Sequence, residues 1–270
     1  MRANLKVLLL VFACEWITII VNAQKLPVTQ NASIRAPSNI KIDGQLSEWG
    51  GLLQALNPID KLSYTISNDD ENLYLTLVAP YKEACKKVLR GGLTFTVSQR
   101  TDKRRKDDPS NKAITFPIAK NQQYLGLFEN FEEYSGYTDK TGKGKRKRDS
   151  LFKLTNQKAA AFFKTVEIND KIVPLTSIQG VMGSVQFNKN MDLVYELSIP
   201  LKYLGLNITY TESFSYNVCL NGESMEMRDM ERKANPSIPA PTPPPGYIPP
   251  SPDVALAPTD FWGEYTLAKK

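Results

Sequence analysis

The chain contains no histidine, and this absence excludes several kinds of site. Nucleophilic serine or cysteine sites with a His base, zinc sites with a His ligand and haem sites with a His axial ligand all need that residue. Chemistry that uses carboxylates alone remains open. The 270 residues include 34 Lys or Arg and 28 Asp or Glu, so the net charge is +6 and the chain is mildly basic.

Cysteine and long apolar runs are also scarce. The three cysteines are Cys14, Cys85 and Cys219. Whether Cys85 and Cys219 form a disulfide stays open, because nothing in the sequence brings them within bonding distance. Glu15 interrupts the main apolar run, whereas a membrane-spanning helix needs about 20 uninterrupted apolar residues. The sequence therefore predicts no transmembrane span.

Residues 1–23 have the layout of a secretory signal peptide, with a basic start, an apolar middle and small residues at the end. We expect the mature chain to begin at Gln24 and to be secreted, to the periplasm, the outer membrane or the extracellular space. A lipoprotein anchored through Cys14 is the minor alternative. It is disfavoured because the apolar stretch WITIIVNA would follow the lipid, where a solvated tether is expected.

The segments after residue 33 are mostly short, rich in Val, Ile, Thr, Tyr and Phe, and separated by turn residues. This pattern is typical of β-strands. Helical periodicity is limited to 81–89 and 156–163. The sequence thus predicts an all-β fold, an antiparallel β-sandwich with short helical insertions. The expected strands are 33–36, 39–44, 62–67, 72–79, 92–99, 113–119, 164–168, 181–188, 193–201, 213–220 and 261–268.

Three segments interrupt the strand pattern. Residues 100–112 look like a charged hairpin loop, and the Gly- and Lys/Arg-rich segment 137–149 is expected to be mobile. Ten of the eighteen prolines lie in 234–260, which favours extended polyproline II. Because only about ten residues follow, we interpret this tract as a surface loop that leads to the last strand. The predicted organisation is an N-terminal extension at 24–34 and one domain at 35–268.

Four motifs, in this order, resemble the family 9 carbohydrate-binding-module-like (CBM9-like) β-sandwich domain of the wider DOMON-like group. The resemblance implies a jelly-roll-like sandwich of two antiparallel sheets over about 35–268. In the sugar-binding members it also implies aromatic rings that clamp a sugar terminus, with structural calcium nearby. The motifs are IKIDGQLSEW at 40–49, SNDDENLYLTLVA at 67–79, GLTFTVSQ at 92–99 and LVYELSIPLKYLGL at 193–206.

The first motif is expected to build the fold rather than to bind. Asp43 and Gly44 form a tight-turn pair, because Asp accepts local backbone hydrogen bonds and Gly adopts positive φ. Strand alternation predicts that the Trp49 ring points into the core with its N–H paired. Glu48 is expected to accept from backbone donors near the turn.

The aromatic residues at 124–137 exceed what a strand and a turn need for packing, and Glu129, Glu132 and Glu133 lie among them. Aromatic rings beside carboxylates suit a carbohydrate, whose apolar face stacks on a ring while acids accept from its hydroxyls. Trp262 is a second candidate because it follows the proline tract. The predicted ligand-binding residues are Tyr124, Phe128, Phe131, Tyr134, Tyr137 and Trp262.

Two further clusters are candidates for ions or partners. Asp69, Asp70 and Glu71 place three carboxylates in a turn, which is the best candidate for a calcium site in the chain, although an ordinary solvated turn is the favoured interpretation. The basic runs Lys103–Lys106 and Lys143–Arg148 could dock an anionic surface. No nucleic-acid partner is predicted, because aromatic residues do not interleave with these charges.

The sequence therefore predicts a secreted, non-catalytic binding module with a carbohydrate ligand. A glycosidase is disfavoured, since neighbouring glutamates reach the required 5–9 Å separation by chance. The alternative is an envelope or surface interaction protein whose basic and proline-rich loops dock a protein or an anionic partner.

Overall fold

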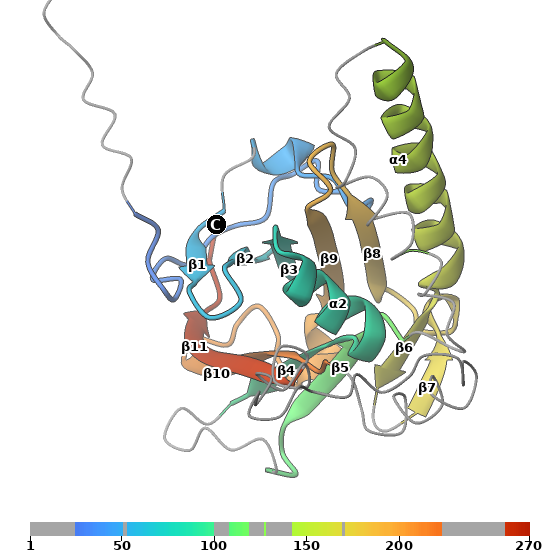
Figure 1. Cartoon of the computed structure of the whole chain (residues 1–270). Coiled ribbons are helices and arrows are strands. Elements are labelled where there is room, and N and C mark those ends of the chain that lie inside the picture. The colour runs from blue at the N-terminus through green and yellow to red at the C-terminus, as the bar shows by residue number, and fades with distance from the viewer. Residues whose placement is uncertain are drawn as a thin grey trace, which may run out of the picture.

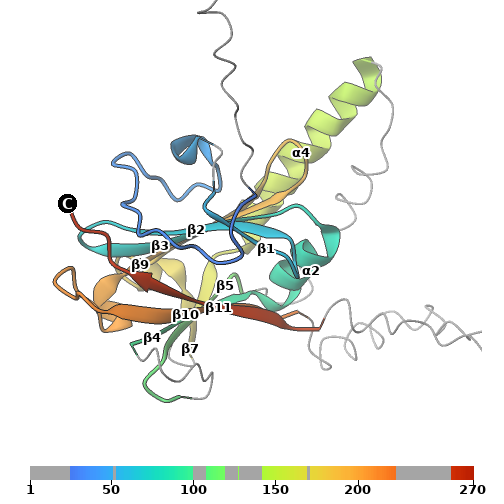
Figure 2. The same ribbon diagram turned by 90° about the vertical axis from the view of Figure 1, so that its left-hand side faces the viewer.

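The computed structural model describes residues 25–50, 53–99, 108–118, 127, 142–168, 171–222 and 257–270, with only the backbone at 142–146. These residues form two antiparallel sheets and two helices (Figures 1 and 2). The all-β fold class is confirmed. The helices are α2 (Lys82–Gly91) and α4 (Gly142–Phe162), and short 3₁₀ turns are η1 (Ser47–Trp49), η2 (Leu175–Ser177) and η3 (Leu201–Leu204).

The five-stranded sheet, sheet A, has the order β1-β2-β3-β9-β8, and the six-stranded sheet, sheet B, has the order β11-β10-β4-β5-β6-β7. All neighbouring strands in both sheets pair antiparallel. The strands of sheet A are β1 (Ala55–Asn57), β2 (Leu62–Asn68), β3 (Asn72–Ala79), β8 (Met182–Phe187) and β9 (Leu193–Pro200). Those of sheet B are β4 (Leu93–Ser98), β5 (Lys112–Phe116), β6 (Thr165–Ile168), β7 (Lys171–Pro174), β10 (Ser213–Leu220) and β11 (Thr259–Thr266).

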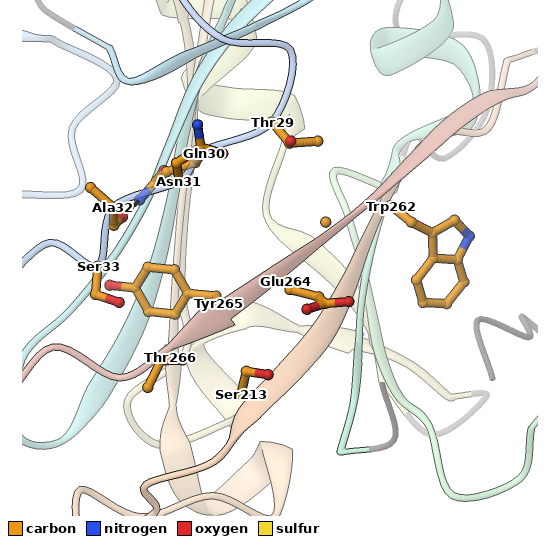
Figure 3. A pocket seen from close by; sticks show the side chains of 11 residues that line it. Thr29, Gln30, Asn31, Ala32, Ser33, Ser213, Trp262, Glu264, Tyr265 and Thr266 are labelled. Carbon is orange, nitrogen blue, oxygen red and sulfur yellow. Dashed lines mark hydrogen bonds between the residues drawn. The ribbon is translucent and has the colours of Figure 1, made fainter. Parts of the chain in front are cut away.

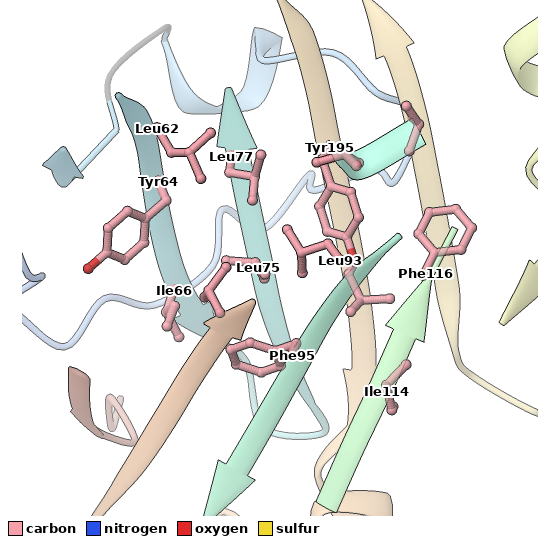
Figure 4. Packing of buried hydrophobic residues seen from close by; sticks show 14 of the residues in the cluster. Leu62, Tyr64, Ile66, Leu75, Leu77, Leu93, Phe95, Ile114, Phe116 and Tyr195 are labelled. Carbon is pink, nitrogen blue, oxygen red and sulfur yellow. The ribbon is translucent and has the colours of Figure 1, made fainter. Parts of the chain in front are cut away.

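The hydrophobic core lies between the two sheets (Figure 4). Because side chains alternate along a strand, every second residue of the central strands points into this layer. On β3 these are Leu73, Leu75 and Leu77, all buried. Across the layer, the hydroxyl groups of Tyr64 on β2 and Tyr216 on β10 lie 3.1 Å apart, so the two sheets share a buried hydrogen bond.

The outer face of sheet A carries a polar row that is also buried. Thr65, Thr76, Glu196 and Ser184 are register partners on β2, β3, β9 and β8. The first three are at most 1% exposed. A sheet with polar groups on a buried outer face must have a cover, since such groups need hydrogen-bond partners. Part of that cover is the segment before η1, which bonds to Glu196.

Helix α4 is much longer than the sequence predicts, and the expectation of a mobile segment at 137–149 is wrong for its helical part. The basic part of α4 contains no proline, and Lys and Arg are good helix formers that offset the weak propensity of Gly142 and Gly144, although this part lacks an apolar stripe. The second half of α4 packs on β8, where Thr155 and Ala159 are buried. Its other half projects beyond the sheets (Figure 1).

Several smaller expectations also change. Residues 39–44 form a turn rather than a strand, and 33–36 contribute one isolated bridge at Arg35.

The two cysteines among the described residues are not joined by a disulfide: Cys85 and Cys219 are free buried thiols. Burial raises the pKa of the Cys85 thiol to about 12. Within the described residues, neither helix combines the length and apolar character that a membrane crossing requires.

A buried ion pair joins three distant parts of the sandwich. Lys87 Nζ on α2 lies 2.9 Å from Asp60 Oδ1 in the β1–β2 turn and 3.1 Å from Thr259 Oγ1 at the start of β11. The Thr259 hydroxyl in turn donates to Asp60 Oδ2. The side chains of Lys87 and Asp60 are 6% and 7% exposed, so each charge depends on the other.

Removal of one partner is expected to destabilise the protein strongly. Because Asp60→Asn or Lys87→Met leaves one buried group without its counter-charge, each should lower the free energy of unfolding by about 3–5 kcal/mol. Urea denaturation measures this, with Lys153→Met on the exposed side of α4 as the matched control. The double variant should lose less than the sum of the two single variants. Additive losses would show that the pair is not coupled.

Candidate functional site

Trp262 is the predicted ligand-binding residue that the structure describes, and it lies on β11 at the edge of sheet B. Its neighbour Phe261 points to the core side and packs on Tyr64, with ring centroids 5.0 Å apart. Alternation therefore puts Trp262 on the opposite, outer face, where it is half-buried. Tyr124, Phe128, Phe131, Tyr134 and Tyr137 lie outside the described residues.

A cavity of about 460 Å³ lies along β11 (Figure 3). Figure 3 shows Trp262, Glu264 and Thr266 along one side of the strand and Tyr265 on the other, next to the segment 29–33. The described lining residues carry mainly hydroxyl, amide and backbone groups, and the Trp262 ring points away from the segment 29–33 (Figure 3). Glu264 is the one charged residue among the described residues that line it. The lining residues are Thr29, Gln30, Asn31, Ala32, Ser33, Ser213, Trp262, Gly263, Glu264, Tyr265 and Thr266.

Side-chain hydrogen bonds position the segment opposite β11. The Gln30 amide accepts from Ile66 N and donates to Ile66 O, both at 2.7 Å, and so continues the edge of β2 beyond the three-residue β1. The Tyr265 hydroxyl accepts from Ile34 N at 3.1 Å and donates to Ile34 O at 2.9 Å. The segment is thus attached to sheet A at one point and to sheet B at another, with the cavity beside it.

The outer face of sheet B next to the cavity also carries polar side chains. Trp262 is the register partner of Asn217 on β10, and Asn217 is that of Thr96 on β4. The Asn217 amide donates to Asp260 Oδ2 at 2.8 Å. In the next row, Ser215 is fully buried and its hydroxyl has no hydrogen-bond partner in the described part of the chain. An aromatic ring therefore stands beside rows of hydroxyl and amide groups.

Two of the three carboxylates proposed for calcium, those of Asp69 and Asp70, already have protein partners. Asp69 Oδ1 accepts from the backbone N–H groups of Glu71 and Asn72, both at 2.7 Å, and Oδ2 accepts from the Tyr74 hydroxyl. Burial alone would raise the pKa of Asp69, but these hydrogen bonds outweigh it and lower the pKa. Asp70 bonds to Lys270 and Arg35, which lower its pKa.

The described residues contain no group of three or more cysteine or carboxylate side chains placed to hold a metal ion. Calcium binding at Asp69, Asp70 and Glu71 stays a prediction. Of the basic runs, the side chains described are those of Lys147, which is exposed, and Arg148, which is half-buried. Lys103–Lys106 lie outside the described residues.

Glu196 is the residue that sequence reasoning missed. It lies on the outer face of β9 with 0% exposure, and its Oε2 accepts from Asp43 N at 3.0 Å and Gly44 N at 2.8 Å. We call this pair of hydrogen bonds the Glu196 clasp. The one signal in the sequence was a carboxylate in a strand that is otherwise apolar or small, and a buried charge needs a specific partner.

The turn held by the Glu196 clasp has the predicted local hydrogen bond at Asp43 and the predicted positive φ at Gly44. Asp43 Oδ1 accepts from Gln45 N at 3.0 Å, and Gly44 has φ +78°. A Cβ at Gly44 would lie 2.4 Å from Gln186 Cγ, so the position requires glycine for space as well as for φ. The turn therefore fits closely against β8.

Two expectations about the same motif are wrong. Trp49 lies in η1, outside the core cluster, and its buried Nε1 has no hydrogen-bond partner among the described residues. Glu48 accepts from the Ser47 hydroxyl, because Glu196 takes the backbone donors of the turn. The alternation that would have turned Trp49 inward fails, since 39–44 is not a strand.

Burial raises the pKa of Glu196 to about 7. The N–H groups of Gly44 and Asp43 act in the opposite direction, and the nearby negative charges of Asp43 and Glu48 raise the pKa further. Its Oε1, like Thr76 Oγ1 in the same polar row, is buried without a hydrogen-bond partner in the described residues. Glu196 is thus a carboxyl group that changes charge near neutral pH.

Comparison with known proteins gives no relative for this chain: no family model matches it, and no curated protein matches it.

Glu196 should make the stability of the protein depend on pH. Its pKa is about 7 in the folded protein and ordinarily 4.5, so the folded state favours the protonated form. The stabilisation is complete below pH 4.5 and is lost as the pH rises through 7. The free energy of unfolding, relative to Glu196→Gln, should fall by about 3 kcal/mol across this window. Urea denaturation at several pH values measures it, and a constant difference between the two proteins would contradict the assignment.

Proposed function

We propose that the protein is a secreted, non-catalytic binding module, and that its ligand is a carbohydrate held on the outer face of sheet B beside Trp262. The observation that carries this proposal is a half-buried indole at a cavity whose other walls present hydroxyl and amide groups. The volume of about 460 Å³ lies in the range of ligand pockets. The resemblance of four motifs to the CBM9-like domain supports the same class of ligand.

The chemistry of the cavity favours a neutral sugar over a polyanion. A pyranose ring presents an apolar face that stacks on an aromatic ring, while its hydroxyl groups exchange hydrogen bonds with polar walls. Ser33, Ser213 and Thr266 supply hydroxyl groups around the cavity, and Glu264 supplies a carboxylate. No lysine or arginine is among the described residues that line the cavity, so none of these residues would offset the charge of an acidic polysaccharide.

Attachment to an anionic surface is the second candidate function. The observation that favours it is the projection of the first half of α4 beyond the sheets, with Lys147 exposed (Figure 2). This function would use a different part of the molecule from Trp262.

A glycan-array screen of residues 24–270, with and without calcium, tests the main proposal. For any glycan that binds, Trp262→Ala should weaken binding at least tenfold in isothermal titration calorimetry, because the stacking surface is lost. Tyr81→Ala is the matched control, since Tyr81 is 45% exposed, lies beside Lys61 and is not among the described residues that line the cavity.

Three outcomes separate the candidates. Binding to no glycan would overturn the carbohydrate proposal, as would binding that Trp262→Ala leaves unchanged. Binding only to sulfated or acidic polysaccharides, lost at high salt and retained in Trp262→Ala, would favour the anionic-surface function. Binding that requires calcium and is lost in Asp70→Ala would support the predicted calcium site.

A further inference from the structure

A second cavity is lined by the 43–47 turn, α4 and the β8–β9 hairpin. Figure 1 shows α4 and β8 on the other side of the molecule from β11. Its volume is about 620 Å³, larger than that of the cavity beside Trp262. It borders sheet A rather than sheet B, so it does not belong to the proposed carbohydrate site. The apolar residues among those that line it are Leu46, Phe152, Phe187 and Val194. Phe187 directs its side chain into the core and borders the cavity with its backbone, so Leu46, Phe152 and Val194 supply the apolar surface.

Two pairs of hydrogen bonds hold these walls in place. On one side, the Asn156 amide on α4 donates to Phe187 O at 2.9 Å and accepts from Phe187 N at 2.7 Å. β8 is the last strand of sheet A in the described residues, and the Asn156 amide bonds to both backbone groups of Phe187 as the backbone of a neighbouring strand would. On the other side, the Glu196 clasp fixes Asp43 and Gly44. Neither wall can move inward to close the space without loss of such bonds.

The third wall is fixed as well. At the β8–β9 hairpin, Asn188 Oδ1 accepts from the backbone N–H groups of Asn190 and Asp192, and its amide donates to Asp192 Oδ2. The cavity therefore stays open because side-chain hydrogen bonds at Asn156, Glu196 and Asn188 hold its three walls in place. Such a preformed, mainly apolar cavity with a few polar groups is the usual form of a small-molecule site.

The lining residues define the class of ligand. Asp43 and Lys189 contribute one negative and one positive charge, so the lining residues that the structure describes carry no net charge that would select an ion. Gln45 and Gln186 contribute amides. The half-buried ring of Phe152 offers an aromatic surface, and aromatic rings pair favourably with other rings.

We propose that this cavity is a second binding site, which takes a small, uncharged, mainly apolar molecule that contains a ring system. The proposal does not depend on the carbohydrate function, because the two cavities share no residue and border different sheets.

Titration with the neutral aromatic probe N-phenyl-1-naphthylamine, in which a phenyl ring and a naphthalene are joined through one N–H, tests the proposal on residues 24–270. We expect a saturable rise in its fluorescence at one probe per chain. Phe152→Ala removes the aromatic wall and should weaken binding at least tenfold. Ser47→Trp places a large side chain at an exposed lining position and should weaken it by a similar factor. Thermal unfolding checks that each variant folds.

The controls separate this site from the other cavity. Trp262→Ala should bind the probe as the parent does, and loss of binding in that variant would overturn the assignment. Absence of saturable binding to the parent would overturn it too. If Phe152→Ala does not fold, Ser47→Trp decides alone, and unchanged binding in that folded variant would contradict the proposal.

Discussion

The Glu196 clasp is the interaction on which the arrangement of sheet A depends. It joins the turn at Asp43 and Gly44 to the centre of β9, more than 150 residues later in the chain. Because Glu196 stands in a polar row with Thr65, Thr76 and Ser184, it gives the covering segment a fixed place over buried polar groups. The carboxyl group is costly to bury in its charged form, and this cost raises its pKa toward neutrality. The same residue therefore stabilises the cover and makes its stability depend on pH.

A second consequence concerns the outer faces of both sheets. In a simple sandwich the inner faces form the core and the outer faces meet water. Here Ser67 and Ser198 on sheet A, and Ser98 and Ser215 on sheet B, are fully buried although they belong to polar outer rows. The sandwich is thus a core enclosed by two polar layers. Features that could recognise a ligand gather where these layers reach a sheet edge, and Trp262 stands at one such edge.

The sequence predicted regular strands well and long-range attachments poorly. The bounds expected for β3 and β10, 72–79 and 213–220, agree with the structure, because their β-branched and aromatic residues pack on one face or both. The three residues of β1 and the four of β7 were missed, since such short edge strands depend on their neighbours.

The length of helix α4 was underestimated because its basic half has no apolar stripe. Trp49 was placed in the core by an alternation that the Asp43–Gly44 turn interrupts. Trp262 was placed correctly on a last strand, but its cavity depends on Gln30, more than 230 residues away.

The two cavities share a physical cause. In each, an irregular segment or a helix passes a sheet edge and is held there by a side chain that bonds to the backbone. Gln30 attaches the N-terminal segment to Ile66, and Asn156 attaches α4 to Phe187. Apolar packing would draw such elements together until no space remained, because buried contacts are not directional. Hydrogen bonds have fixed lengths and angles, so they set the position of the element without requiring close packing along its length. Cavities at the edges of this sandwich are therefore a product of how its loops are attached, and the chemistry of each cavity follows from the residues that the attached segment brings: Thr29, Asn31 and Ser33 beside β11, and Leu46 and Phe152 beside β8.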